Sequence, residues 1–232
     1  NAYQERYMPG STFKVITAAG ALEAGLINTE SSWEDESEFL PPQTNDPIQN
    51  YANKVCGGDL AEVFRRSCNT PFARTAIALG PQKMVDIAQS FGIGEVVPFD
   101  LPRAVSSQFG DVDYFKENLP LLGIGGFGQG NTQMVPLHMA MVAASIANKG
   151  MMMKPYVVAA TYDHGGTVLR RTSPTVWKTP MSSATSALLT ELMIGVVNEG
   201  TAKCCMSLAN GVQAAAKTGT AQLNAAGEPQ SS

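Results

Sequence analysis

The alanine-rich stretch TFKVITAAGALEAG, which begins at Thr12, constrains the fold more than any other segment of this chain. Its apolar residues recur at near-helical spacing from Phe13 to Ala21, which predicts a helix of about three to four turns. Ser11 is expected to cap this helix, and Gly25 is expected to end it. Because alanine side chains are small, the helix is expected to lie in a tightly packed interior.

The rest of the chain predicts an α/β protein of the α+β type, with a lobe of short helices. Five further segments carry apolar residues at helical spacing: residues 59–67, 71–80, 81–92, 134–150 and 183–202. Residues 30–58 are acidic and contain prolines, so they predict a surface loop or short strands, and residues 93–133 predict irregular structure rich in glycine and proline. Residues 156–163 and 167–172 predict two paired strands, and residues 211–222 predict a strand that delivers Lys217 to an open edge.

Composition places the chain among globular proteins and argues against nucleic-acid binding. Hydrophobic residues make up 44% of its 232 residues and charged residues 16%, which suits one substantial core or a two-lobed domain. The net charge of -4 makes nucleic acid an unsuitable partner, because a phosphate-backbone binder normally carries a basic surface. The most apolar stretch, residues 134–147, is too short to cross a membrane and contains Pro136 and His138. Any membrane anchor is therefore expected to lie outside this chain.

The four cysteines do not predict a metal site. Cys56, Cys68, Cys204 and Cys205 lack metal-ligand spacing, and only two histidines are present, so no zinc or other metal is expected. The cysteines are compatible with one disulfide or with none. Cys56 and Cys68 could pair across a loop, whereas sequence neighbours such as Cys204 and Cys205 rarely form a disulfide with each other.

Three short motifs follow one another along the chain: Ser11-Thr12-Phe13-Lys14, Ser67-Cys68-Asn69 and Lys217-Thr218-Gly219. Taken alone, each has an ordinary structural interpretation, as a helix cap beside a lysine, a helix-breaking turn and a strand end. Together, S-x-x-K, S-D-N and K-T-G form the signature of penicillin-binding proteins and class A β-lactamases. The stretch GIGGFGQG lacks the Gly-Lys-Ser/Thr ending of a phosphate loop, so it is interpreted as a structural loop that flanks the active site.

On these motifs, the chain resembles the transpeptidase domain of the penicillin-binding proteins. Residues 128–140, GQGNTQMVPLHMA, strengthen the resemblance, because they are similar to a Gly-Gln-Gly segment and a following helix that serine β-lactamases lack as a rule. The similarity is greatest to the class B enzymes, the monofunctional D,D-transpeptidases, and among these to the penicillin-binding protein A type. Cys68 stands where the lactamase-like motif has Asp, a position that varies among the transpeptidases.

The resemblance implies the penicillin-binding protein/serine β-lactamase-like fold, a helical lobe beside a five-stranded antiparallel sheet with flanking helices. In this family the first two strands precede the serine motif, and the last two follow the Lys-Thr-Gly strand. We therefore expect residues 1–232 to be part of one transpeptidase domain, with an incomplete sheet and with the outer strands and the N-terminal anchor region outside the chain. Expressed alone, these residues are not expected to form a stable active enzyme, because a lone strand leaves backbone groups unpaired at both edges.

Acyl transfer requires these residue types at this spacing. A serine hydroxyl is a weak nucleophile and needs an adjacent base. Residues three apart share one face of a helix, so Lys14 is expected to reach the Ser11 hydroxyl. To act as that base the lysine must be neutral, and partial burial together with the nearby cation Lys217 would lower its pKa. The start of the helix also places backbone N–H groups near Ser11.

The resemblance assigns roles to the other motif residues. Ser67 would bridge Lys14 and Lys217 and pass a proton to the leaving amine as a general acid, while Asn69 would hold the amide of the donor peptide. The terminal carboxylate of the substrate would be bound by Lys217, Thr218 and Thr220. The backbone N–H groups of Ser11 and Thr220 would form the oxyanion hole. Gly219 would leave room for the substrate backbone beside the strand.

The implied function is that of a peptidoglycan D,D-transpeptidase at the extracytoplasmic face of the bacterial cell membrane. Stem peptides ending in D-Ala-D-Ala would acylate Ser11, and penicillin and other β-lactams would inhibit the enzyme covalently. No cofactor is implied. Cell-division or elongation proteins are further expected partners.

Two other functions stay open on the sequence. In a D,D-carboxypeptidase or β-lactamase-like hydrolase, water would replace the acceptor amine, although the acidic loop with Glu34, Asp35, Glu36 and Glu38 does not match the lactamase deacylation pattern. In a non-catalytic β-lactam sensor or divisome scaffold, acylation would be a signal, and the acyl-enzyme would be long-lived with no turnover of peptide.

Overall fold

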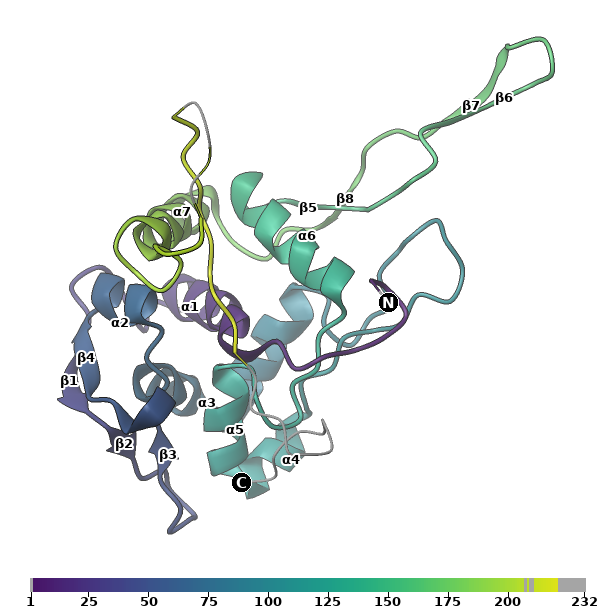
Figure 1. The fold of residues 1–232 in the computed structure, drawn as a ribbon. Helices are drawn as coiled ribbons and strands as arrows, with labels where there is room; N and C mark the ends of the chain where they lie inside the picture. Colours follow the sequence, from purple (N-terminus) through teal and green to yellow (C-terminus); the bar gives the residue numbers. More distant parts are fainter. Residues whose placement is uncertain (1, 207, 209–210, 221–232) are drawn as a thin grey trace.

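The computed structural model describes residues 2–206, 208 and 211–220, and it shows a helical body from which one long arm projects (Figure 1). The helical segments are the 3-10 helices η1 (Gly10–Phe13) and η2 (Tyr51–Asn53) and the α-helices α1 (Lys14–Glu23), α2 (Leu60–Arg66), α3 (Thr70–Ser90), α4 (Val112–Glu117), α5 (Leu119–Gly126), α6 (Pro136–Ala147) and α7 (Ser183–Asn198). α1 contacts α3 and α7, and α3 also packs against α5. Every residue of α1 from Lys14 to Ala21 is buried, which confirms the interior position that its alanine-rich sequence predicts.

The strands within the described residues form four antiparallel pairs and no larger sheet. The pairs are β1 (Ser32–Glu36) with β4 (Cys56–Asp59), β2 (Glu38–Phe39) with β3 (Ile48–Gln49), β5 (Met152–Met153) with β8 (Val176–Lys178), and β6 (Ala160–Tyr162) with β7 (Val168–Arg171). The first two pairs confirm short strands in residues 30–58. The pair β6 and β7 confirms the predicted strand pair and forms the end of the arm (Figure 1).

The turn before α1 differs from the predicted helix cap. Pro9 precedes the first helical residue, and Ser11 is the second residue of η1. The cause is a tertiary contact, because the Gly10 N–H donates to the Gly128 carbonyl at 2.9 Å and helps to fix a 3-10 turn that begins before the serine. At the other end of α1, Gly25 has a φ of 65°, which confirms the predicted helix end.

The helices after residue 59 mostly follow the predicted segments. The Asp59 side chain accepts the Glu62 N–H at 2.7 Å and thereby caps α2. α3 joins two predicted helices and bends between them at Gly80, which has a φ of 80° and precedes Pro81. α6 and α7 confirm the last two predicted helices, and no helix in the described part of the chain is long and apolar enough to cross a membrane.

Residues 93–133 contain two helices, α4 and α5, that the glycine-rich sequence does not predict. The glycines of α5 permit close helix packing: a Cβ atom on Gly126 would lie 2.4 Å from the Cβ of Ala76 in α3. A Cβ atom on Gly123 would lie 3.1 Å from Ile77 Cδ1 of the same helix. The prediction of irregular structure is wrong for α4 and α5, and in α5 the reason is that these glycines accommodate a neighbouring helix.

The segment that carries the Lys-Thr-Gly motif does not form a strand between residues 211 and 220, which corrects the prediction for that part. The segment is attached to α7, where the Ala216 N–H donates to the Met193 carbonyl at 3.1 Å. A strand requires a pairing partner, and none of the described strands pairs with this segment. Residues 221 and 222 of the predicted strand lie outside the described residues.

Both cysteine pairs form disulfides. Cys56 of β4 is bonded to Cys68, with Cα atoms 5.7 Å apart, which is the pairing across a loop that the sequence left open. Cys204 and Cys205 are also bonded to each other, so the expectation against a bridge between these neighbours is wrong. The tight turn that follows α7 brings these two adjacent, exposed side chains together.

Candidate active site

The three sequence motifs meet at one cleft of about 1460 Å³. The predicted site residues that line it come from all three motifs and from the position after the last one: Ser11, Ser67, Asn69, Thr218, Gly219 and Thr220. Lys14 and Lys217 reach the same place from the interior, because both hydrogen-bond to Ser67. Within the described residues, no side chain hydrogen-bonds to the Ser11 hydroxyl.

Two glycines allow distant segments to close around η1. Gly128 has a φ of 84°, and a Cβ atom there would lie 2.1 Å from the Gly10 carbonyl oxygen. The Gly-Gln-Gly segment therefore abuts the turn that carries Ser11, and GIGGFGQG flanks the cleft as expected. A Cβ atom on Gly219 would lie 2.9 Å from Thr12 Cγ2, so this position requires a glycine in order to pack against η1. This packing requirement is separate from the expected role of Gly219 in leaving room for the substrate backbone.

Lys14 is fully buried at the start of α1, and its ammonium group faces polar acceptors. Its Nζ atom donates to the Ser67 carbonyl at 2.7 Å and to Asn69 Oδ1 at 2.8 Å, and it lies 3.4 Å from Ser67 Oγ. These bonds differ from the expected one, since no hydrogen bond joins Lys14 to Ser11 among the described residues. Burial holds the pKa of Lys14 well below its usual value, and the charge of Lys217 lowers it further.

Ser67 connects the two lysines. It follows the last residue of α2 in the left-handed region, with a φ of 62°, an uncommon conformation for a residue other than glycine. The Lys217 ammonium group donates to Ser67 Oγ at 2.6 Å. Burial lowers the pKa of Lys217 to about 7, so this lysine can hold or release a proton near neutrality. The Ser67 hydroxyl thus lies between two amines whose pKa values are both depressed.

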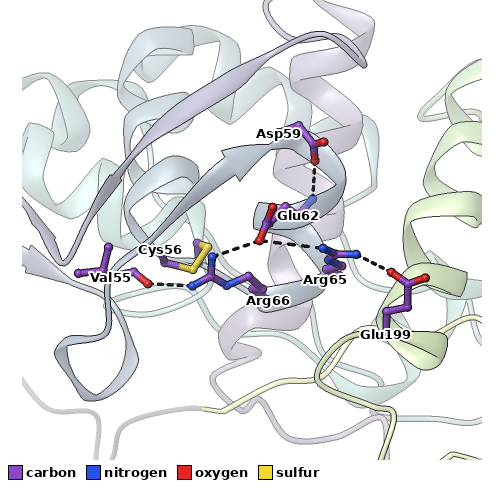
Figure 2. Close-up of polar contacts among 8 residues, drawn as sticks. Val55, Cys56, Asp59, Glu62, Arg65, Arg66 and Glu199 are labelled. Carbon is purple, nitrogen blue, oxygen red and sulfur yellow. Dashed lines mark hydrogen bonds and ion pairs between the residues drawn. A yellow bond between two sulfur atoms is a disulfide. The ribbon is translucent and has the colours of Figure 1, made fainter.

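A group of charged side chains makes ion pairs along α2, the helix that precedes Ser67 (Figure 2). The Glu62 carboxylate pairs with Arg66 at 3.3 Å and approaches Arg65 at 4.0 Å. Arg66 also donates to the Val55 carbonyl at 2.8 Å, and Arg65 pairs with Glu199 at the end of α7. Exposed ion pairs of this kind contribute little to stability individually. Together they link the end of α2 to the residue before β4 and to the residue after α7.

Sequence reasoning missed two residues at this site. Asn50, in the turn after β3, accepts the Asn69 N–H at 2.6 Å through its side-chain oxygen. Thr201, in the turn after α7, places its hydroxyl 2.6 Å from the Thr218 hydroxyl. A single Asn or Thr in a turn belongs to no motif and carries no spacing signal, so only the folded structure identifies them.

Charged groups are few along the cleft itself. Among the residues that the structure describes, the charged side chains lining the cleft are Asp46 and Arg66, and the acidic residues 34–38 do not line it. Glu36 pairs instead with Arg74, whose Nη2 atom lies 2.7 Å from the carboxylate. Across residues 2–206, 208 and 211–220, no three His, Cys, Asp or Glu side chains come together to hold a metal ion.

Comparison with known proteins places this arrangement in a family. The family model for the penicillin-binding protein transpeptidase domain matches residues 1–232. The chain is 34% identical over 225 residues to peptidoglycan D,D-transpeptidase PbpA of Mycolicibacterium smegmatis, and 37% identical over 229 residues to PbpA of Mycobacterium tuberculosis. Each match covers 95% of this chain and 44% of the relative.

Solved structures share the fold. The D,D-transpeptidase domain of a peptidoglycan glycosyltransferase from Eggerthella lenta superposes with a TM-score of 0.91 at 28% identity, over 97% of this chain and 56% of that one. Penicillin-binding protein A from M. tuberculosis, solved as a ceftriaxone acyl-enzyme complex, superposes with a TM-score of 0.87 at 31% identity, over 97% of this chain and 50% of that one.

The chain therefore belongs to the family of penicillin-binding protein transpeptidase domains and has their fold, in which helices combine with short antiparallel strands. Within that family, the curated relatives described above are PbpA D,D-transpeptidases, and the chain spans about half of their length.

Proposed function

We propose that this chain carries the acylation site of a peptidoglycan D,D-transpeptidase, with Ser11 as the nucleophile. The observation that carries the proposal is the series of polar contacts from Lys217 through Ser67 to the buried Lys14, three residues after the serine. The structures of M. tuberculosis penicillin-binding protein A as ceftriaxone and penicillin G acyl-enzyme complexes support covalent chemistry with β-lactams in this fold.

Lys14 is suited to act as the general base because its burial favours the neutral amine. A neutral amine has two N–H bonds and one lone pair. The two short hydrogen bonds, to the Ser67 carbonyl and to Asn69 Oδ1, use both N–H bonds. The lone pair is then left to take the proton of the Ser11 hydroxyl as Oγ attacks the carbonyl carbon of the donor peptide.

Acylation is completed when the tetrahedral intermediate collapses and its C–N bond breaks. The leaving D-alanine amine takes a proton from the Ser67 hydroxyl, and the Lys14 ammonium group replaces that proton. The proton that left Ser11 thus reaches the leaving group in two transfers, and Lys14 is neutral again. In the second half-reaction an amine of a neighbouring stem peptide attacks the ester, and its proton returns to Ser11 by the same route.

We assign the donor amide, the terminal carboxylate and the oxyanion of the substrate to polar groups that do not take part in the proton transfers from Ser11. Asn69 keeps one lone pair and one N–H for the donor amide, since its Oδ1 accepts from Lys14 and its Nδ2 donates to the Gln49 carbonyl at 3.0 Å. The Lys217 charge, with the hydroxyls of Thr218 and Thr220, forms a suitable site for the terminal carboxylate of a D-Ala-D-Ala peptide. The backbone N–H groups of Ser11 and Thr220 are the proposed oxyanion donors.

Transfer to an amine is the proposed second half-reaction, because the acidic loop considered for hydrolysis lies away from the cleft. A hydrolase needs a base that activates water for deacylation, and the acidic residues 34–38 do not line the cleft. Peptidoglycan stem peptides are therefore the proposed donor and acceptor, β-lactams the proposed covalent inhibitors, and the extracytoplasmic face of the bacterial membrane the proposed site of action. Cell-division or elongation proteins remain proposed partners.

The test is to map the penicillin adduct on the full-length protein by intact-mass and peptide analysis. Wild type should carry one adduct on Ser11, and Ser11→Ala should carry none. Ser90→Ala is the matched control, because Ser90 is exposed and does not line the cleft, and it should be labelled like wild type. An adduct on any other residue would defeat the assignment. Incubation of the acyl-enzyme with an amine acceptor then separates the alternatives, since a hydrolase releases acid whether or not the amine is present.

A further inference from the structure

Asn50 is a buried carboxamide at the edge of the cleft, with all of its hydrogen-bonding capacity in use. Only 4% of the residue is exposed. Its Oδ1 atom accepts the Asn69 N–H at 2.6 Å and the Thr70 N–H at 3.1 Å. Its Nδ2 atom donates to the Glu36 carbonyl at 2.9 Å and to the Thr70 hydroxyl at 3.2 Å. An amide side chain offers two lone pairs and two N–H bonds, and each has a partner here.

The two N–H groups that Asn50 accepts lie at the start of α3, where a helix leaves its first donors without internal partners. Asn69 occupies the N-cap position of α3, and an Asn there ordinarily turns its own side chain back to cap the helix. The Asn69 side chain makes no such bond. Its oxygen accepts from Lys14 and its nitrogen donates to the Gln49 carbonyl instead. Asn50 thus supplies the acceptor for the N–H groups of the N-cap residue and of the first helical residue, which the Asn69 side chain is not placed to accept.

Asn50 is itself held in place from two sides. Its backbone N–H donates to the Ser37 carbonyl at 3.0 Å, and its side chain reaches the Glu36 carbonyl at the end of β1. The Glu36 carboxylate receives two bonds from Arg74 of α3, at 2.9 and 2.7 Å. The carboxamide is thus anchored to the end of β1 and to the helix that it caps, so it has a fixed position relative to Asn69.

We infer that Asn50 is a positioning residue for the acylation step: by accepting the Asn69 and Thr70 N–H groups, it fixes the backbone from which the Asn69 carboxamide holds the Lys14 amine and the donor amide. The inference rests on the proposed function, since it concerns how that base is held. Asn50 acts through Asn69 and is not assigned a contact with the reacting atoms. Without Asn50, the Asn69 backbone is no longer held on this side, and the short hydrogen bond from Lys14 to Asn69 Oδ1 loses its fixed geometry.

Two substitutions in the full-length protein separate positioning from a purely structural role. Asn50→Leu keeps the number and branching of the side-chain heavy atoms but removes both acceptor bonds and both donor bonds. Asn50→Asp keeps an acceptor for the two N–H groups, next to a helix N-terminus that favours negative charge, but loses the donor to the Glu36 carbonyl. Asn28→Ala is the matched control, because Asn28 Oδ1 also accepts a backbone N–H, from Glu30 at 2.8 Å, in an exposed turn.

The measurements are the second-order rate constant for acylation by a fluorescent penicillin and the melting temperature. Asn50→Leu should acylate about tenfold to a hundredfold more slowly. A loss of this size is expected when a catalytic group is displaced by up to about 1 Å. Asn50→Asp should recover most of the rate although its melting temperature also falls. Asn28→Ala should acylate like wild type.

The outcomes distinguish the inference from the function on which it rests. A folded Asn50→Leu protein that acylates at the wild-type rate would overturn the inference, as would an Asn50→Asp protein as slow as Asn50→Leu. If Asn50→Leu does not fold, Asn50→Asp still decides: a rate close to wild type supports positioning by the acceptor, and a severe loss contradicts it. Failure of wild type to acylate at Ser11 would contradict the proposed function itself.

Discussion

Loss of the Cys56–Cys68 disulfide should destabilise the structure around Ser67 and Asn69. The two cysteines are separated by 12 positions, so the bond closes a short loop in the unfolded chain. The chain-entropy treatment of such a loop gives a stabilisation of about 3 kcal/mol. Both cysteines are buried, at 6% and 2% exposure, and their replacement by alanine leaves no polar group unpaired. Loss of the cross-link should therefore dominate the change in free energy.

Hydrogen-exchange mass spectrometry of the full-length protein measures this change locally. In the double variant Cys56→Ala/Cys68→Ala, amides in residues 56–70 that exchange by opening of this region should exchange roughly a hundredfold faster, which corresponds to about 3 kcal/mol. Because Cys68 lies between Ser67 and Asn69, acylation by a fluorescent penicillin should slow in the same variant. Reduction of wild type with a phosphine should have the same two effects.

The control is the double variant Cys204→Ala/Cys205→Ala. Its cysteines are separated by 1 position, so their bond closes no chain loop and its removal should leave exchange in residues 56–70 unchanged. Wild-type exchange rates in the Cys56→Ala/Cys68→Ala protein would refute the loop-entropy reasoning. Equal acceleration in both double variants would show that the effect does not come from the cross-link at Cys68.

Two further predictions concern the lysines and the packing of η1. The second-order acylation constant should fall in acid as Lys14 becomes protonated, and it should fall again above about pH 7 as Lys217 loses the charge that attracts the substrate carboxylate. Lys217→Arg should remove the alkaline decline, because a guanidinium stays charged, and a pH profile with the decline intact would contradict this assignment. Gly128→Ala should destabilise the fold by at least about 2 kcal/mol in thermal melts, since its φ is 84° and its Cβ would lie 2.1 Å from the Gly10 carbonyl oxygen. The control Gly195→Ala, in α7 with no atom within 4 Å of the new Cβ, should instead stabilise by about 0.5 to 1 kcal/mol, and a destabilisation of equal size in both variants would argue against the steric explanation.

Helices with regular apolar spacing could be predicted from the sequence, and those that depend on packing could not. α1, α6 and α7 follow from their periodic apolar residues. α5 does not, because glycine ordinarily weakens a helix, whereas Gly126 is needed for close contact with Ala76 of α3. The strand expected around Lys217 depends likewise on a pairing partner, which no local pattern can supply.

The candidate site shows the same division. The three motifs single out Ser11, Lys14, Ser67 and Lys217 as candidates by residue type and order alone, and the structure brings these motifs to one cleft. The expected bond from Lys14 to Ser11 is replaced by bonds to Ser67 and Asn69, which become available only when α2 and α3 pack against α1. Asn50 and Thr201 have no motif, so their contacts with Asn69 and Thr218 could not be predicted.

The sequence by itself determined which chemical groups the site contains: a serine, two lysines, a second serine and a carboxamide, together with the glycines that let their segments meet. Only the tertiary structure decided which of these groups touch and how strongly they hold protons. Lys14 and Ser67 are 53 positions apart, and Lys217 and Ser67 are 150 apart. The lowered pKa of Lys14 is expected from its proposed role as a base and is confirmed, but the burial that causes it comes from residues distant in the chain, so its physical origin is seen only in the folded structure.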